Sequence, residues 1–115
     1  MKLLISHIDF EKMIGRSPLE PGDTIAPFTV IWFSASWCGP CQKVDGDRLI
    51  AELPNIEWLK CDIDQNNYTP GFCGVKSIPT FMAVAGKKIL GKLQSSSTED
   101  VIRWAKILYE AWKEE

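Results

Sequence analysis

The strongest constraint in the sequence is an uninterrupted run, Phe28-Thr29-Val30-Ile31-Trp32-Phe33, made almost entirely of β-branched and aromatic residues. Such a run is typical of a strand that is buried on both faces of a sheet. Helices must then cover both faces, so the run predicts an α/β fold with this strand at its centre. The length of 115 residues and the hydrophobic fraction of 45% fit a single domain over residues 1–115.

Turn-forming residues divide the rest of the chain into further strands and helices. Apolar runs predict strands at residues 3–6, 28–33, 56–63, 80–85 and 88–93. Helical patterns lie between them, at residues 8–14, 40–53 and 68–73, and a last helix follows the polar residues 96–100. The sheet is therefore expected to be parallel where helices connect its strands and antiparallel at a final hairpin.

Two of these elements have a predicted place in the fold. Lysines in the strand at residues 88–93 indicate a sheet edge. In the last helix, one stripe is apolar and indicates the side that faces the core; it consists of Val101, Ala105, Leu108 and Trp112.

Charge and composition exclude several classes of partner. The formal net charge is -2, and the basic residues are scattered, so we expect no nucleic-acid partner. The apolar start, Met1 to Ile5, is too short for a signal peptide or a membrane span. We therefore expect a cytoplasmic, monomeric protein without membrane contact or cofactor, whose four cysteines stay reduced, bind metal or do chemistry.

The first two cysteines form a C-x-x-C pair directly after the buried strand, where open α/β sheets present reactive groups. If Pro40 begins a helix, Cys38 lies at its N-terminus, which favours an exposed, nucleophilic thiolate. Cys41 lies three residues later on the same side and is the expected resolving cysteine. Gly39 permits close approach of a substrate backbone. No side chain between the cysteines adds a positive charge that would strongly favour the reduced dithiol, so the pair is expected to act as a reductant rather than as an oxidant.

Three segments together resemble the thioredoxin family. The segment from Phe33 to Cys41, which contains Trp37-Cys38-Gly39-Pro40-Cys41, is similar to its active site. Lys60 to Asn66 resembles its third-strand segment, and Ser77 to Phe81 its cis-proline loop. The resemblance covers most of residues 28–94. It implies a thioredoxin fold and a protein-disulfide reductase that is itself reduced by an electron donor of the thioredoxin-reductase type.

The resemblance also implies how a substrate would dock. Pro79 would be cis and lie against the dithiol, and Ile78 would pair with an extended substrate backbone. The docking surface would be apolar, and would consist of Trp37, Gly39, Pro40, Ile78, Pro79 and the Leu93-Gln94-Ser95 loop.

Two positions depart from the family pattern. Trp32 stands where the family commonly has a buried aspartate, and Gln94 stands where it has a glycine. Tryptophan fills the core but cannot take the proton of the resolving cysteine, so we expect the second half-reaction to slow at neutral pH. Lys60 matches the family lysine that usually pairs with this aspartate, so here it would have no such partner. We expect its side chain to reach towards solvent, where it could still favour a nearby thiolate.

The other polar residues give weaker indications. Cys61 and Cys73 are interpreted as small core residues, with redox regulation or a second disulfide as the alternative. The cysteine spacing lacks the second close pair of a zinc ribbon, so no metal is expected. His7, the one histidine, is distant in sequence from every cysteine, and a cysteine-hydrolase mechanism lacks its base. Asp62 and Asp64 are expected to cap a turn.

A second class of function stays open at this point. The same fold could serve as a binding module that grips a partner through the docking surface without redox turnover. Such a module would bind equally well after Cys38 and Cys41 are both replaced by serine, whereas a reductase would lose its activity. An oxidase or isomerase is disfavoured by Gly39-Pro40 between the cysteines.

Overall fold

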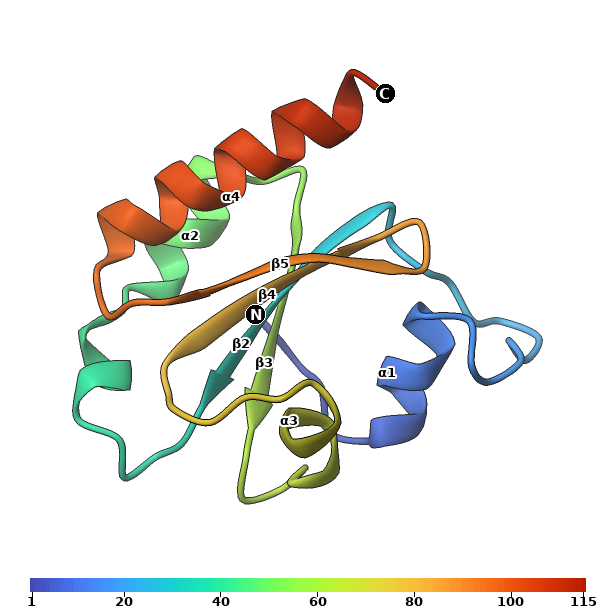
Figure 1. Ribbon diagram of the computed structural model, residues 1–115, viewed down its shortest axis with the longest axis horizontal. Coiled ribbons are helices and arrows are strands. Elements are labelled where there is room, and N and C mark those ends of the chain that lie inside the picture. Colours follow the sequence, from blue (N-terminus) through green and yellow to red (C-terminus); the bar gives the residue numbers. More distant parts are fainter.

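The computed structural model describes residues 1–115 and contains one five-stranded sheet in the order β1-β3-β2-β4-β5 (Figure 1). The strands are β1 (Lys2–Leu3), β2 (Phe28–Ser34), β3 (Glu57–Asp62), β4 (Thr80–Ala85) and β5 (Lys88–Gln94). Every residue of β2 is buried, so the predicted central strand is confirmed.

The pairing of the strands brings two loops together at one end of the sheet. Strand β2 runs parallel to β3 and antiparallel to β4. Ser34, the last residue of β2, is in register with Asp62, the last residue of β3. The segments that follow these two strands therefore leave the same end of the sheet. The cysteine pair lies in the segment that follows β2.

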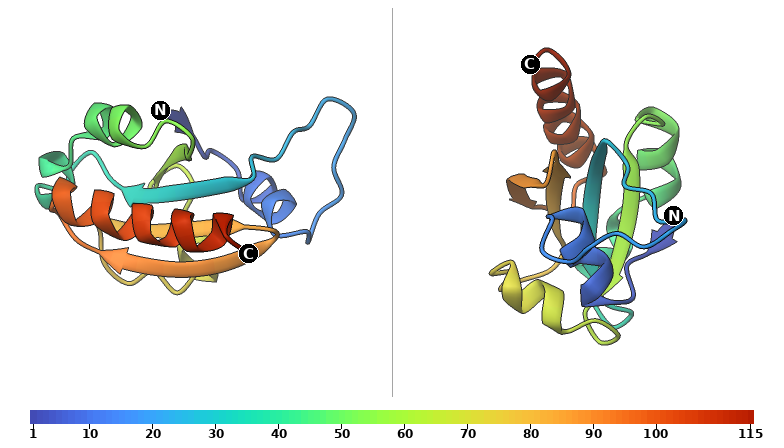
Figure 2. Two further views of the ribbon diagram at one scale, coloured as in Figure 1. Left: turned by 90° about the horizontal axis from the view of Figure 1, so that it is seen from above. Right: turned by 90° about the vertical axis from the view of Figure 1, so that its right-hand side faces the viewer.

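Helices cover both faces of the sheet. They are α1 (His7–Met13), α2 (Gly46–Glu52), α3 (Tyr68–Phe72) and α4 (Thr98–Lys113), together with a 3-10 turn, η1 (Pro40–Lys43). Helices α2 and α4 lie together on one face, and α1 and α3 lie on the other (Figures 1 and 2). The expected α/β class with helices on both faces is confirmed.

The alternating side chains of β2 supply two hydrophobic cores. Phe28, Val30 and Trp32 point towards α2 and α4, where Val101 and Ala105 of α4 join them. On the opposite face, β2 packs through Ile31 and Phe33 against residues of α1, which include Phe10 and Met13. Because successive residues of a strand face opposite sides, Ser34 shares the face of Trp32.

The expected helix over residues 40–53 is wrong in one respect, because the chain breaks it after the first turn. Residues Pro40–Lys43 form η1, and α2 begins only at Gly46. Asp45 lies between them in an extended conformation and caps α2, since its side chain accepts the backbone N–H of Arg48 at 3.1 Å. Cys38 therefore lies just before a short 3-10 turn, and Cys41 lies within it.

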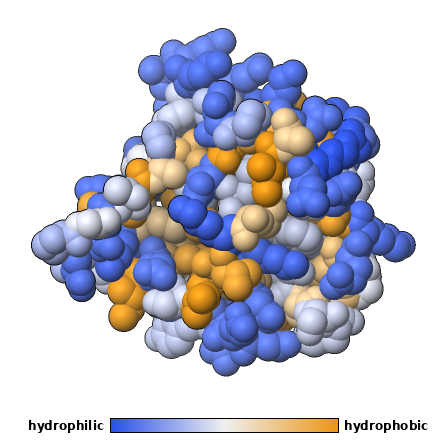
Figure 3. Space-filling view, turned by 180° about the vertical axis from the view of Figure 1, so that it is seen from behind, coloured by the Kyte–Doolittle hydropathy of each residue, from blue (hydrophilic) through white to orange (hydrophobic).

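The two sheet edges differ from each other. The expected first strand over residues 3–6 is reduced to Lys2–Leu3, because the chain turns at buried Leu4 towards α1. The other edge is β5, as the lysines predicted, and it follows a hairpin turn in which Gly86 and Lys87 both have positive φ. Seen from behind, the surface carries small groups of hydrophobic side chains among hydrophilic ones (Figure 3).

Candidate active site

Cys38 and Cys41 are joined by a disulfide, with their Cα atoms 5.3 Å apart. Cys41 is fully buried, as expected of a resolving cysteine. Cys38 is only 4% exposed, so the expectation that it is exposed is wrong for this oxidised form. Ala35 packs against both cysteines and covers them from the strand side, whereas Gly39 and Pro40 are exposed.

The sulfur of Cys38 is held by backbone groups. The N–H of Cys41 donates to Cys38 Sγ at 3.2 Å, and the N–H of Cys38 donates to the carbonyl of Ala35, also at 3.2 Å. A four-residue 3-10 turn adds little macrodipole, so this directed N–H group is the local feature that favours negative charge on Cys38.

The proline loop lies beside the disulfide. The Ile78–Pro79 peptide bond is cis, as the resemblance implied. The carbonyl oxygen of Ile78 lies 3.9 Å from Cys38 Sγ, and the hydroxyl of Thr80 donates to the carbonyl of Ser77 at 2.7 Å. Residues 37–41 and 77–80 therefore meet around one sulfur atom.

Trp37 is the most exposed apolar residue of this region, with 66% of its surface accessible. Its indole N–H donates to Asp64 Oδ2 at 2.9 Å, and the N–H of Asp64 donates to Asp62 Oδ1 at 2.9 Å. The turn cap expected of the two aspartates is thus present, but the bond that orients Trp37 is not evident from the sequence. The parallel pairing of β2 and β3 is the signal that could have indicated this bond, because it brings the loops after the two strands to the same end of the sheet.

A groove of about 550 Å³ runs from Trp37 along the proline loop to α3. Its apolar lining consists of Trp37, Ile63, Pro70, Val75 and Ile78. Ile63 and Ile78 also pack against the two cysteines, so the floor of the groove continues to the disulfide. Residues of α3 also line this groove, and no sequence pattern had pointed to them.

The remaining residues of the expected docking surface lie at the end of β5. Gln94 pairs with Thr80 and is exposed, which places it beside the proline loop. Leu93 pairs with Phe81 and is half-buried against the core that contains Trp32. Of these two residues, Gln94 thus offers the larger surface near Pro79.

Trp32 fills the core, as expected. It is 5% exposed and stacks on Phe81, with ring centroids 5.7 Å apart. Lys60 does not simply reach into solvent: its Nζ lies 4.6 Å from the centre of a Trp32 ring. Lys60 therefore makes a cation–π contact with Trp32, where the family pattern implies an ion pair with an aspartate.

A second hollow, of about 650 Å³, is lined in part by Cys41. Trp32, Cys41 and Lys60 line it together with Asp45 and Asp47 of the turn between η1 and α2. Cys38 does not line this hollow. The structure thus brings the two predicted tuning positions, Trp32 and Lys60, to Cys41 rather than to Cys38.

The other two cysteines are free and buried, Cys61 in β3 and Cys73 directly after the end of α3. Burial, assisted by the carboxylate of Asp62, raises the pKa of Cys61 to about 12. Burial also raises the pKa of Cys73 to about 11, although nearby Lys92 opposes the shift. Neither thiol forms appreciable thiolate at neutral pH.

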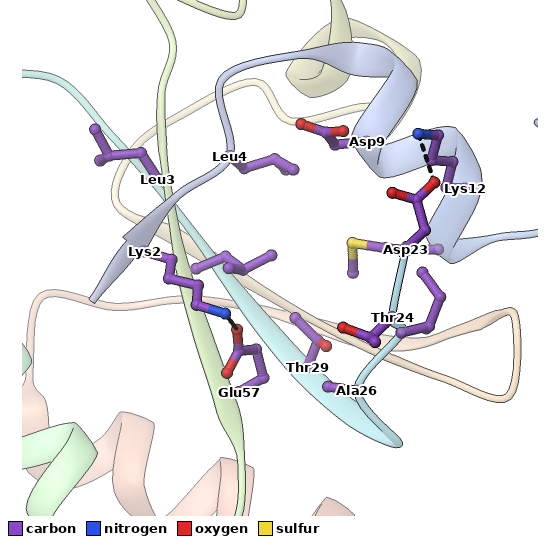
Figure 4. A pocket seen from close by; sticks show the side chains of 13 residues that line it. Lys2, Leu3, Leu4, Asp9, Lys12, Asp23, Thr24, Ala26, Thr29 and Glu57 are labelled. Carbon is purple, nitrogen blue, oxygen red and sulfur yellow. Dashed lines mark ion pairs between the residues drawn. The ribbon is translucent and has the colours of Figure 1, made fainter. Parts of the chain in front are cut away.

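A further hollow, of about 370 Å³, lies between α1, β1 and the start of β2, at the opposite end of β2 from the disulfide (Figure 4). Two ion pairs cross it, Lys12–Asp23 at 2.8 Å and Lys2–Glu57 at 3.3 Å. No cysteine lines it, and no cluster of three potential metal ligands occurs in the structure. No helix is long and apolar enough to cross a membrane.

The fold and the site together define a thiol-disulfide oxidoreductase: a buried disulfide joins the residue before a short helical turn to a residue of that turn, beside a cis-proline loop and a partly apolar groove. The thioredoxin family model matches residues 23–106, which is well over half of the chain. The chain belongs to the thioredoxin family, whose members reduce protein disulfides.

Individual relatives agree with this assignment. An H-type thioredoxin of Ricinus communis is 33% identical over 85 residues, which cover 72% of each chain. A thioredoxin of Geodia cydonium is 33% identical over 105 residues, or 90% of this chain and 92% of the other. The solved structure of Fasciola hepatica thioredoxin has a TM-score of 0.76 at 26% identity, and covers 92% of this chain and 97% of its own.

Proposed function

We propose that Cys38 attacks disulfides in other proteins and that Cys41 then releases the reduced product. The observation that carries this proposal is the position of the pair. Cys38 Sγ accepts a backbone N–H and lies next to half-buried Ile78, which lines the groove, whereas Cys41 is fully buried and Pro79 is buried as well. A substrate sulfur that arrives from the groove therefore meets Cys38 first.

We also propose that the substrate binds as an extended segment across Trp37 and the proline loop. The backbone of Ile78 would pair with it, and the exposed Gly39, Pro40 and Gln94 would flank it. The groove along α3 has room for an apolar side chain next to the disulfide. The docking surface thus extends beyond the residues named from the sequence.

Trp32 and Lys60 are proposed to tune the resolving step. Trp32 offers no basic group, while Lys60 brings a positive charge to the hollow that Cys41 lines. A positive charge near a thiol favours the thiolate. The two residues would act on the release of product rather than on the first attack.

The setting of the reaction is likewise proposed. We infer an electron donor of the thioredoxin-reductase type, an electron-transport role in cell redox homeostasis, and a monomer in the cytoplasm. One relative, thioredoxin-3 of Saccharomyces cerevisiae, is described as mitochondrial and is 35% identical over 66 residues. Fractionation of the source cells would decide between these compartments.

The test of the proposed function is reduction of a disulfide-linked protein, with and without a thioredoxin reductase system. The wild-type chain should reduce the substrate catalytically, whereas Cys38→Ser should be inactive. Cys41→Ser should accumulate substrate as a reducible adduct, because nothing remains to release the mixed disulfide. Partner binding that is unchanged when both cysteines are serine, without any reduction by the wild type, would instead identify a binding module.

Alkylation of the reduced protein tests the assignment of the nucleophile. Cys38 should be labelled first near neutral pH, because a backbone N–H favours its thiolate and the docking surface leads to it. Cys61 and Cys73 should resist labelling until the protein unfolds, since both are buried with raised pKa values. Equal labelling of Cys38 and Cys61 in the native protein would contradict the assignment, and mass mapping distinguishes the two.

A further inference from the structure

Ser34 has a buried hydroxyl without a hydrogen-bond partner. The residue is 1% exposed and ends β2, and its Oγ contacts no donor or acceptor within hydrogen-bonding range. Buried polar atoms in folded proteins nearly always have a partner. An exception calls for an explanation, and at an active site a redox or catalytic role of the group is one of them.

The same face of β2 carries a second unpartnered donor. The indole Nε1 of Trp32, two residues before Ser34, is also buried without an acceptor. Lys60 contributes an ammonium group to this region, so all three side chains offer hydrogens. The acceptors that line this hollow, Asp45 and Asp47, are exposed, and neither Trp32 Nε1 nor Ser34 Oγ has a partner in the oxidised site.

Cys41 is the group that can become this partner. Cys41 lines the same hollow as Trp32, and Ser34 lies two residues after Trp32 on the same face of β2. Ala35, the residue that follows Ser34, belongs to the same buried cluster as Cys41. Residues on both sides of Ser34 along the chain therefore adjoin Cys41. A disulfide sulfur is a weak acceptor, whereas a thiolate is a strong one, so opening of the Cys38–Cys41 bond changes the hydrogen-bonding capacity at this place.

We propose that the hydroxyl of Ser34 donates a hydrogen bond to the sulfur of Cys41 once the disulfide is open, and so stabilises the resolving thiolate. The inference rests on the proposed function, because it concerns the second half of that reaction. It gives the site a means of forming the thiolate without a buried carboxylate: a donor stabilises the charged product instead of a base removing the proton.

In the mixed disulfide, Cys38 is bonded to a substrate sulfur, and the thiol of Cys41 loses its proton to solvent through the hollow that it lines. The thiolate of Cys41 attacks Cys38 Sγ, a Cys38–Cys41 bond forms, and the bond to the substrate breaks. The substrate leaves as a thiolate that takes up a proton from solvent. Cys38 and Cys41 are oxidised, and the substrate disulfide is reduced.

The test compares Ser34→Ala with two matched variants. Ser34→Thr keeps the hydroxyl, and Ser36→Ala removes an exposed hydroxyl two residues further along the chain. The first measurement is a titration of Cys41 by thiolate absorbance in a Cys38→Ser background. Cys61 and Cys73, with pKa values of about 12 and about 11, do not interfere.

Ser34→Ala should raise the titration midpoint of Cys41 by about one pH unit, as expected for the loss of a hydrogen bond to a charged group. In single-turnover reduction of a peptide disulfide, release of the mixed disulfide at pH 7 should slow about tenfold. Ser34→Thr should retain most of the wild-type rate, and Ser36→Ala should match the wild type. The oxidised Ser34→Ala protein should be at least as stable as the wild type in urea, because it loses a buried group that has no partner.

Unchanged titration and release in Ser34→Ala would overturn the inference, and so would an oxidised Ser34→Ala protein that is clearly less stable. These results leave the proposed function untouched as long as Cys41→Ser still captures substrate. If Cys41→Ser forms no mixed disulfide, the proposed function itself fails. If Ser34→Ala does not fold, the titration of Ser34→Thr decides. This variant keeps the hydroxyl, so a Cys41 midpoint about one pH unit above that of the wild type would contradict the inference.

Discussion

The indole N–H of Trp37 donates to Asp64 at 2.9 Å and so ties the loop after β2 to the loop after β3. Asp64→Ala should free the Trp37 ring and raise KM for a protein disulfide about threefold with little change in kcat, because an exposed hydrogen bond contributes about 0.5 to 1.5 kcal/mol. Steady-state kinetics measure both constants. Asp9→Asn, an exposed change in α1, is the control, and an unchanged KM in Asp64→Ala would show that Trp37 needs no support.

Stability should fall as the pH rises through the alkaline range. Burial raises the pKa of Cys61 from 9.0 to about 12, so the folded state holds a proton that the unfolded state loses in this window. The free energy of unfolding therefore decreases between about pH 9 and 12. Cys61→Ala should show a shallower decrease in urea titrations of the oxidised protein. Parallel pH profiles for the two proteins would contradict the role given to Cys61.

Trp32→Asp should flatten the pH dependence of product release. With tryptophan at this position, release should speed up as the pH approaches the pKa of Cys41, whereas an aspartate can accept the proton at lower pH. The change should also cost about 3 to 5 kcal/mol, since it removes a buried ring and buries a charge. Single-turnover reduction from about pH 6 to 9, with folding checked in urea, provides the test.

Trp32→Phe serves as the control for this change, because it keeps a ring next to Phe81 and offers no base. Its release profile should stay as steep as that of the wild type. A wild-type profile that is already flat between these limits would mean that the site compensates fully for the missing carboxylate.

Gly46→Ala should destabilise the protein through Trp32. A Cβ at position 46 would lie 3.3 Å from Cζ3 of Trp32 and 3.4 Å from Cε of Met1. Overpacking of this kind costs about 1 to 2 kcal/mol. In a Trp32→Phe background the cost should largely disappear, and a double-mutant cycle in urea measures the coupling. Additive effects would show that the ring and the glycine are independent.

Local patterns predicted most of the architecture. The run at residues 28–33 required a strand buried on both faces, and the stripe from Val101 to Trp112 required a helix on the core. Their period and apolar character follow from local chain geometry, so no knowledge of distant contacts was needed. The position of the Cys38–Cys41 pair after β2 followed from the same reasoning.

The features that the sequence did not reveal depend on contacts between distant residues. Trp37 and Asp64 are 27 positions apart, and the cation–π contact of Lys60 with Trp32 requires the register of β2 against β3. The low exposure of Cys38 depends on Ala35 and on the proline loop, which pack around it from two directions. The break after η1 reflects a capping aspartate whose effect competes with a helical pattern.

The tight fit of Trp32 against Gly46 also has a consequence for protein engineering. A tryptophan grafted at the matching position of a related scaffold would press on any side chain that the scaffold carries where this chain has Gly46. The graft therefore calls for the glycine as well, and the two residues are best transferred as a pair.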